Sequence, residues 1–326
     1  MTLPGNNNEN TIKGKTMKLI IQIPCYNEAE TLPVTLKELP RKVDGFDKVE
    51  WLIINDGSTD ETVQVALKNG VDHIVSFKKN RGLAEVFKAG LDACIHFGAD
   101  VIVNTDADNQ YDASDIPKLT EPILSGKAEI VIGARPITQI KHFSLIKKIL
   151  QKFGSYVVRN VSKTDIPDAP SGFRAISRDA AMKLNVFNNY TYTLETIIQA
   201  GRKNMAITWV DINVNEDLRP SRLVKSIFMY IKKSLITIIR IFMIYEPFVF
   251  FMRIGIFTIL AGILLGLRYI FFLFSGDGSG HVQSLILSSI LLVVGFQTLI
   301  TAFIADLLSA NRKLLEDIQY RIKKKE

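Results

Sequence analysis

The sequence predicts an α/β domain with a mostly parallel sheet and flanking helices, followed by amphipathic interface helices and a two-helix transmembrane hairpin. Three observations lead to this fold class. Apolar segments rich in Ile and Val alternate with helical segments through the first 135 residues, as in parallel sheets covered on both faces. Basic amphipathic stretches follow, and the last quarter of the chain holds two long apolar runs.

The strands and helices of the α/β domain can be placed in order. Each predicted strand is a short apolar run, and each predicted helix has apolar residues at helical spacing. The strands are expected at 18–24, 49–56, 72–77, 99–106, 128–135 and 205–214, and the helices at 27–39, 57–70 and 83–98. Ser58 or Thr59 should cap the second helix and Gly70 should close it. Ligands of such sheets bind beyond the carboxyl ends of the strands.

The last quarter of the chain predicts two membrane spans. Residues 248–274 and 284–307 are each long enough to cross a hydrocarbon core, which needs about 20 residues. The segment between them has no Lys or Arg, whereas both outer flanks are basic. The positive-inside rule therefore places both chain ends and the α/β domain in the cytoplasm, and the protein in the cell membrane. The alternative is a helical hairpin buried in a soluble core.

Two basic amphipathic segments indicate contact with a membrane surface. Residues 222–240 and 142–158 each place basic side chains opposite aliphatic ones, the pattern of a helix lying in the interface. The alternative for each is a domain-packing helix with a solvated basic face. The predicted organisation is a disordered lead at 1–16, the α/β domain at 17–218, a juxtamembrane helix at 219–245, spans at 248–274 and 284–307, and a basic cytoplasmic tail at 308–326.

The net charge of +7 allows nucleic acid, anionic lipid or phosphorylated partners. The basic residues gather next to the apolar runs and not on a face that bears aromatic residues, so membrane lipids are expected partners and nucleic acid is not. Cys25 and Cys94 are the only cysteines, and they form no CxxC motif. They are expected to be reduced, buried thiols.

The stretch VIVNTDADNQYD, residues 101–112, carries the clearest chemical signal. Asp106 and Asp108 follow a predicted strand, so both carboxylates can turn into the crevice at the edge of the sheet. Oxygen ligands of this kind suit Mg²⁺ or Mn²⁺, which bind through one or two carboxylates plus substrate phosphates. Gln110 can add a carbonyl oxygen. Such a cation would stabilise a diphosphate leaving group; the alternative is a solvated acidic turn.

Two other motifs follow the first two strands at the same edge. PCYNEAETL spans 24–32, and INDGSTDET spans 54–62. Tyr26 can stack on a base, and Asp56 can accept hydrogen bonds from a base imide or a ribose. Gly57 permits the tight turn after the second strand.

These motifs, together with DAPSGFR at 168–174, closely resemble the family 2 glycosyltransferases of the GT-A, Rossmann-like fold over residues 17–225. With two spans and RPSRLVKSI at 219–227, the chain is similar to the polyprenyl-phosphate glycosyltransferases, the group of dolichyl-phosphate mannose synthase and bactoprenol glucosyltransferases. Two positions depart from the pattern: Asn55 stands where many members have Asp, and RPSR replaces RxxGxSK.

The resemblance implies roles for the motif residues. Nucleotide binding is implied for Pro24, Tyr26, Glu28, Asp56 and Asp106, and metal binding for Asp106, Asp108 and Gln110. Asp168 would lie near the sugar and the reaction centre, and Arg219 would meet the donor diphosphate or the lipid phosphate. Asp168, Asp108 and Arg219 are thus the predicted catalytic residues, with Arg222 the alternative phosphate contact.

A lipid phosphate also fits the basic part of the sequence. Residues 130–164 hold seven basic residues and no acid. A phosphate monoester is largely ionised near pH 7, because its second pKa is about 6, so it can attack the anomeric carbon without a strong base. The enzyme must position two anions. We expect Arg135, Lys147, Lys148 and Arg222 to bind the lipid phosphate; the alternative is contact with solvent or lipid headgroups.

The expected activity is inverting transfer of one sugar to a polyprenyl phosphate, undecaprenyl or dolichyl, with Mg²⁺ or Mn²⁺. The resemblance favours glucose from UDP-glucose; a GDP-sugar is the alternative donor. A homo-oligomer is expected, because two spans offer little area for mutual burial. One alternative is a processive polysaccharide synthase, but QAGRK at 199–203 lacks the Trp of the QxxRW motif such enzymes carry. The other is a non-catalytic membrane-anchored nucleotide-sugar sensor, which has no need of DxD and Asp168.

Overall fold

The computed structural model describes residues 16–136, 154–156, 158–186, 192–215, 236, 239–240, 243–276 and 278–325. The chain forms two compact units. The first runs to Met229 and takes in the last four residues, and the second comprises Tyr230–Ile322. The predicted lead at 1–16 lies almost wholly outside the described residues.

The first unit is built on a seven-stranded sheet in the order β3-β2-β1-β4-β6-β5-β7. The strands are β1 Lys18–Cys25, β2 Lys48–Asn55, β3 His73–Ser76, β4 Val101–Asn104, β5 Ile130–Ala134, β6 Arg174–Ser177 and β7 Ile207–Asp211. All pairings are parallel except those of β6, which runs antiparallel to β4 and to β5. The predicted mostly parallel sheet is therefore confirmed, while β6 was not among the predicted strands.

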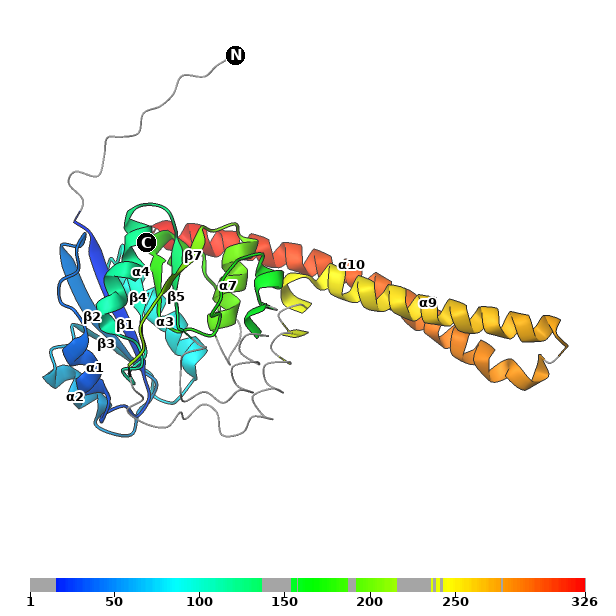
Figure 1. Ribbon diagram of the computed structural model, residues 1–326, viewed down its shortest axis with the longest axis horizontal. Helices are drawn as coiled ribbons and strands as arrows, with labels where there is room; N and C mark the ends of the chain where they lie inside the picture. Colours follow the sequence, from blue (N-terminus) through cyan, green and yellow to red (C-terminus); the bar gives the residue numbers. More distant parts are fainter. Residues whose placement is uncertain are drawn as a thin grey trace, which may run out of the picture. The chain divides into compact units, whose positions relative to one another are not determined.

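Helices cover both faces of this sheet (Figure 1). On one face, Leu19 and Ile21 of β1 share a core with Leu36 and Ile116. On the other face, the close approach of Gly90 to Gln22 brings a helix against the centre of the sheet. The helices are α1 Leu32–Glu38, α2 Thr62–Lys68, α3 Leu83–His96, α4 Ile116–Leu124, α6 Arg178–Lys183 and α7 Thr193–Arg202, with a 3-10 turn, η1, at Ala113–Asp115.

The start of α2 differs from the prediction. The helix begins at Thr62, and neither Ser58 nor Thr59 caps it, because hydrogen bonds to the neighbouring loop engage this segment. The Asn27 N–H donates to Ser58 Oγ over 2.9 Å, and the Thr59 N–H donates to Asn27 Oδ1 over 2.8 Å. The end of the helix agrees with the prediction, since Gly70 follows it with φ +71°.

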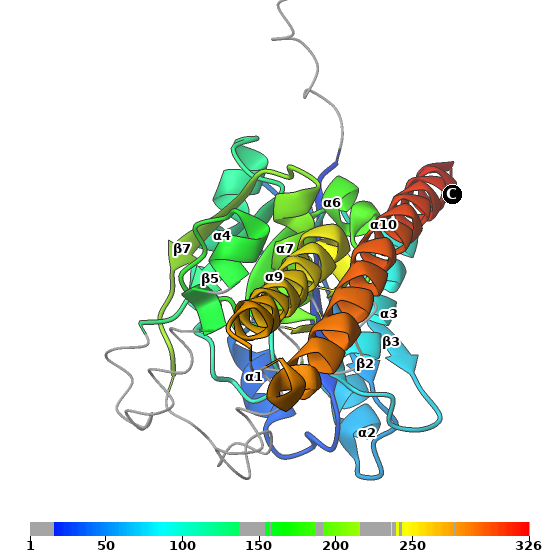
Figure 2. The ribbon, with the colours of Figure 1, turned by 90° about the vertical axis from the view of Figure 1, so that its right-hand side faces the viewer.

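The second unit contains the long helix α9 Pro247–Phe274 and α10 Val282–Lys325 as far as Ile322, joined through the 3-10 turn η2 at Ser279–His281. They lie side by side (Figures 1 and 2), and Ser288 Oγ donates to the Gly262 carbonyl over 2.7 Å. The buried residues of α10 recur every seven positions: Ser288, Gly295, Ala302, Ser309 and Glu316. Both helices are long and apolar enough to cross a membrane. The segment at 308–325, predicted as a tail, continues α10.

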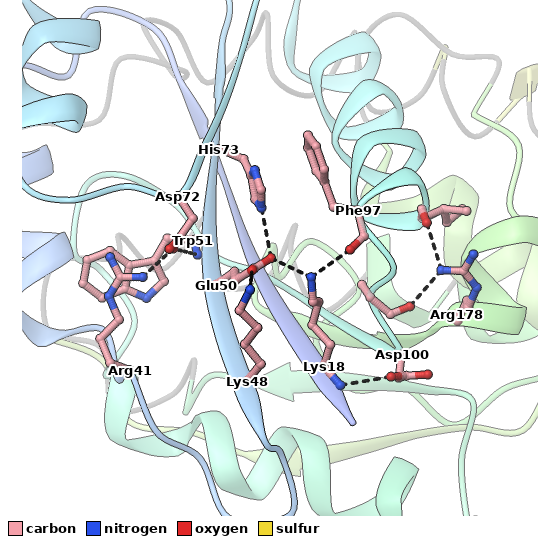
Figure 3. Close-up of polar contacts among 12 residues, drawn as sticks. Lys18, Arg41, Lys48, Glu50, Trp51, Asp72, His73, Phe97, Asp100 and Arg178 are labelled. Atoms are coloured by element: carbon pink, nitrogen blue, oxygen red, sulfur yellow. Dashed lines mark hydrogen bonds and ion pairs between the residues drawn. The ribbon is translucent and has the colours of Figure 1, made fainter. Parts of the chain in front are cut away.

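A buried carboxylate lies at the amino ends of the parallel strands (Figure 3). Glu50, in β2, accepts hydrogen bonds from Lys18 Nζ over 3.0 Å and His73 Nε2 over 2.9 Å, and it also pairs with Lys48. Burial acts to raise its pKa, but the hydrogen bonds from Lys48, His73 and Lys18 outweigh burial and lower the pKa of Glu50 to about 2 from an ordinary 4.5.

This shift predicts an acid-labile contribution to stability. Because the folded pKa lies below the unfolded one, the contribution is complete above about pH 4.5 and is lost as the pH falls toward 2. We expect the stability gap between wild type and Glu50→Gln to shrink by about 3 kcal/mol over that range. Urea unfolding followed by tryptophan fluorescence measures it, since Trp51 and Trp209 both lie in the first unit. A gap that stays constant down the pH range would contradict the assignment.

Candidate active site

The predicted metal ligands lie on one turn after β4. The chain leaves the strand at Asn104, and Asn109 takes the left-handed conformation with φ +57°. The Gln110 N–H donates to Asp108 Oδ1 over 3.2 Å. From the other side, the Asn215 N–H donates to the Gln110 carbonyl over 2.9 Å, and Asn215 Nδ2 donates to the Asn109 carbonyl over 3.1 Å. Hydrogen bonds within the turn and from the segment after β7 therefore fix its shape.

The charges of this turn suit a divalent cation. Burial and the neighbouring Asp108 carboxylate raise the pKa of Asp106 to about 7, against the lowering effects of Arg135, a hydrogen bond from Tyr111, and Arg174. A cation between the two carboxylates would relieve their repulsion. Within the described part of the chain, no three His, Cys, Asp or Glu side chains gather as a metal site. Two carboxylates with an amide oxygen nevertheless fit Mg²⁺ or Mn²⁺, which take their remaining ligands from phosphate and water.

Arg135 and Asp168, predicted to serve different purposes, form one buried ion pair. Arg135 Nε donates to Asp168 Oδ2 over 2.7 Å, and a terminal nitrogen of Arg135 donates to Oδ1 over 3.1 Å. The backbone N–H of Arg135 adds a third bond to Oδ2, at 3.2 Å. The side chains are 8% and 1% exposed. Arg135 therefore orients Asp168, and Asp168 fixes the plane of the guanidinium.

Several residues of the site were missed by sequence reasoning. Asn104, Tyr111, Gly172 and Arg174 lie around Asp106. Arg174, at the start of β6, is fully buried; it donates to Thr196 Oγ1 over 2.6 Å, and burial lowers its pKa. The sequence did contain a signal for three of these residues. Tyr111 follows the DADNQ motif directly, and Gly172 and Arg174 belong to the SGFR motif.

The four predicted nucleotide contacts outside the DxD turn lie at the carboxyl ends of β1 and β2. Tyr26 is 43% exposed, and Pro24 lies within β1. Asp56 is buried, and its two oxygens accept the N–H groups of Arg81 and Gly82 over 2.7 and 3.0 Å. Glu28 Oε2 accepts the Thr31 hydroxyl over 2.8 Å. Asp56 thus holds the loop at Arg81 and Gly82 in place, and Glu28 bonds within its own loop. Any contact that these carboxylates make with a nucleotide must be compatible with these hydrogen bonds.

The loop after β2 has no room for a larger residue than glycine. Gly57 has φ +69°, and a Cβ there would lie 2.7 Å from the backbone of Lys79. The motif INDGSTDET therefore requires this glycine for the close packing of two loops, as well as for the turn predicted from the sequence.

The comparison with known families decides the identity of this domain. The sequence model of Glycosyl transferase family 2 matches residues 20–184, just over half of the chain. The chain belongs to glycosyl transferase family 2. The family match covers the DxD turn, the Arg135–Asp168 pair and the SGFR motif.

Two relatives of this family 2 glycosyltransferase carry names of lipid-phosphate enzymes. An undecaprenyl-phosphate mannosyltransferase of Micrococcus luteus is 27% identical over 218 residues, which are 64% of this chain and 88% of the relative. A dolichyl-phosphate beta-glucosyltransferase of Trichomonas vaginalis is 27% identical over 215 residues, which are 60% of this chain and 64% of the relative.

A solved structure supports the fold of the family 2 glycosyltransferase domain. The glucosyl-3-phosphoglycerate synthase of Mycobacterium tuberculosis, determined with Mn²⁺, UDP-glucose and glycerol 3-phosphate, aligns with a TM-score of 0.53 and 20% identity. The alignment covers 71% of this chain and 79% of the synthase. At this identity the similarity shows the fold alone, and it confirms the predicted GT-A architecture.

Four predicted phosphate contacts of the family 2 glycosyltransferase lie outside the described residues. They are Lys147, Lys148, Arg219 and Arg222. The juxtamembrane helix predicted at 219–245 and the amphipathic segment at 142–158 also lie mostly outside them. The described chain reaches Asn215, which is hydrogen-bonded to the DxD turn, before the RPSR motif begins.

Proposed function

We propose that this family 2 glycosyltransferase moves one sugar from a nucleotide sugar to a polyprenyl phosphate at a membrane surface. One observation carries the proposal: a turn of two repelling carboxylates lies near a buried arginine, in a chain that also has two apolar helices able to cross a membrane. Such a site can accommodate two phosphorylated substrates, and the apolar helices can keep the chain near a lipid acceptor.

Each group of the site then has a chemical task. Asp106, Asp108 and Gln110 would hold Mg²⁺ or Mn²⁺, which supplies positive charge for the departing diphosphate when bound. The Arg135 guanidinium has five N–H donors, of which two bind Asp168, so others can bind a phosphate oxygen. Asp168 acts as a positioning residue for Arg135. A general base is unnecessary, because the lipid phosphate is already ionised at neutral pH.

The reaction is a single displacement with inversion. An oxygen of the lipid phosphate forms a bond to the anomeric carbon, while the bond from that carbon to the diphosphate oxygen breaks and the nucleoside diphosphate leaves with the electron pair. Pro24, Tyr26, Glu28 and Asp56 are proposed to surround the nucleoside. Arg219 or Arg222 is proposed to meet a phosphate, with Lys147 and Lys148 toward the lipid.

We also propose which nucleotide sugar is the donor and which lipid phosphates are the acceptors. UDP-glucose is the favoured donor, supported by the glucosyltransferase relative and by the UDP-glucose bound to the structural neighbour. A GDP-sugar is the alternative donor, and the mannosyltransferase relative makes mannose the alternative sugar. Undecaprenyl and dolichyl phosphates are the candidate acceptors. We also propose that the enzyme is a homo-oligomer with both termini and the catalytic domain in the cytoplasm.

Membranes that contain the protein test this function directly. They are incubated with polyprenyl phosphate, Mg²⁺ or Mn²⁺, and a panel of radiolabelled nucleotide sugars. We expect label to enter the lipid phase with one donor, UDP-glucose, and not with membranes that carry Asp108→Ala. Label in a long polymer would instead indicate a processive synthase. Binding of a nucleotide sugar without transfer from any donor would indicate a sensor.

A further inference from the structure

One face of α10 combines a long exposed apolar stripe with an exposed amide. From Leu287 to Ile322, steps of three and four residues alternate along the helix, and every position reached in this way is exposed. These positions hold Leu, Ile or Val, apart from Gln297, Thr301 and Asn311. We call this face the outer stripe. Its average repeat of 3.5 residues is the repeat of helices that pack along one another.

The outer stripe is distinct from the face of α10 that packs against α9. That second face holds the buried small residues, among them Ser288, whose Oγ donates to the Gly262 carbonyl of α9 over 2.7 Å. At 100° per residue, the two faces point about 130° apart around the helix axis. α10 can therefore pack against α9 on one face and against another helix on the outer stripe at the same time.

The Gln297 amide needs a partner from outside the hairpin. The predicted span covers 284–307, so at 1.5 Å per residue this amide lies about 15 Å or more from either end of the span. Its side chain forms no hydrogen bond with any residue that the structure describes. The Thr301 hydroxyl, by contrast, donates to the Gln297 backbone carbonyl over 2.9 Å. An amide without a partner in hydrocarbon costs free energy, and an amide can both donate and accept, so a second Gln297 would satisfy it.

The outer stripe continues beyond the predicted span, where hydrocarbon cannot cover it. Leu315, Ile318 and Ile322 are 67%, 53% and 54% exposed. Since α10 is continuous, Ile322 lies about 20 Å past the end of the span along the helix axis. Charged residues of this part, such as Lys313 and Asp317, lie on other faces of the helix. A contiguous row of exposed apolar side chains outside the membrane indicates a protein contact.

We propose that the outer stripe of α10 is the surface through which copies of this chain associate, with Gln297 hydrogen-bonded to Gln297 of a second copy. This inference rests on the proposed function, which places the chain at a membrane. Copies that cross the membrane in the same direction have parallel α10 helices, so identical residues meet. Asn311 then also lies opposite Asn311, and polar residues at such positions fix the register of the two helices.

The dimensions of the outer stripe suit a stable interface. From Leu287 to Ile322 the helix is about 50 Å long, and a helix is about 10 Å wide. The flat projection of a contact along it is thus about 500 Å² on each copy. Interdigitated side chains increase this area toward the about 800 Å² that each partner buries in a standard specific interface.

Cysteine cross-linking in membranes tests which face of α10 meets the second copy. Ile318→Cys places a thiol on the outer stripe, and Lys313→Cys places one on an exposed position of another face. The native Cys25 and Cys94 are buried. After mild oxidation of membranes with the full-length protein, we expect a disulfide-linked dimer from Ile318→Cys and not from Lys313→Cys. The dimer should persist when the membranes are first fused with excess lipid, which removes products of random collision.

Replacing Gln297 tests the amide contact itself. Association is measured by Förster transfer between full-length proteins labelled at the amino terminus, in vesicles of increasing lipid content. We expect Gln297→Leu to weaken association by about 3- to 30-fold, the range for hydrogen bonds between membrane helices. Gln297→Asn keeps the amide and should restore most of the affinity. Phe296→Leu, at a neighbouring residue that is 63% exposed on another face, is the matched control and should associate as the wild type does.

The outcomes distinguish this inference from the proposed function. Equal cross-linking of Ile318→Cys and Lys313→Cys would overturn the inference. An unchanged affinity in Gln297→Leu would also overturn it and would indicate that lipid covers the outer stripe. Selective cross-linking by a protein that moves no sugar to lipid would support the association and contradict the proposed function alone. Sugar transfer without selective cross-linking would do the reverse.

Discussion

Asp108→Ala is expected to abolish sugar transfer while leaving the catalytic domain folded. The side chain is partly exposed, so its removal leaves little buried space unfilled. The substitution removes one of the two carboxylates, and the remaining ligands cannot neutralise a divalent cation. Removing a hydrogen-bond partner of a metal ligand typically lowers metal affinity or activity by about 10- to 100-fold. Removing the ligand itself should lower them further. Label transfer to lipid and Mn²⁺ titration are the two measurements.

The same turn supplies a matched control for this experiment. Asp112 lies four residues further on, and its Oδ1 accepts the Ser114 N–H over 2.9 Å at the start of η1. It is not among the proposed ligands. Asp112→Ala should therefore keep the transfer rate and the Mn²⁺ affinity within about twofold of the wild type. Such a change corresponds to the free-energy effect of an ordinary surface substitution, at most about 0.5 kcal/mol. Equal losses in the two variants would show that general acidity of the turn, and not a specific ligand, supports the reaction.

Arg135→Ala is expected to destabilise the catalytic domain strongly, in addition to any effect on the lipid phosphate. The substitution removes the two hydrogen bonds that the Arg135 side chain donates to Asp168, and it leaves the buried carboxylate with the backbone N–H of residue 135 but without its countercharge. Breaking a buried pair from one side costs about 3–5 kcal/mol. For a domain of this size that corresponds to about 6–20 °C in Tm. Tryptophan fluorescence of the full-length protein in detergent reports on this domain, which contains Trp51 and Trp209.

A double-mutant cycle measures the interaction free energy between Arg135 and Asp168 separately from the effect of replacing each residue. Arg135→Ala combined with Asp168→Ala should be less destabilising than the sum of the single changes, because no buried charge remains unpaired. The exposed pair of Lys127 and Glu121, 3.6 Å apart, is the control. Lys127→Ala should change stability by at most about 1 kcal/mol. If Arg135→Ala were no worse than Lys127→Ala, the buried pair would not have the structural importance assigned to it.

The sequence predicted those parts of the molecule that depend on local pattern. The parallel strands, the three helices between β1 and β4, and the DxD turn after β4 follow from apolar periodicity and from where each strand ends, whereas α4, α6 and α7 were not predicted. The pair of Arg135 and Asp168 did not follow, because its partners are 33 residues apart and each was interpreted singly. Ion pairing of this kind is a property of the tertiary fold, and no spacing rule reveals it.

Two further features that the sequence did not reveal have the same physical origin. β6 is only four residues long and begins with a charged residue, so it lacks the apolar run by which the other strands were recognised; its place in the sheet comes from pairing on both sides. The hydrogen bonds that Asp56 accepts from the N–H groups of Arg81 and Gly82 were not predicted either, whereas its proposed role at the nucleoside stays a prediction. Hydrogen bonds between loops, like ion pairs, depend on the tertiary fold.

The antiparallel course of β6 has a consequence for biosynthesis. β1 to β4 can pair among themselves once residue 104 is available, but β5 and β7 reach the rest of the sheet only through β6. Between β4 and β6, Asn104 lies opposite Arg174, a separation of 70 residues, and contacts between such distant segments form late. A growing chain therefore carries the DxD turn for a long interval before Gly172 arrives beside it. The site becomes complete only when the last strands join the sheet.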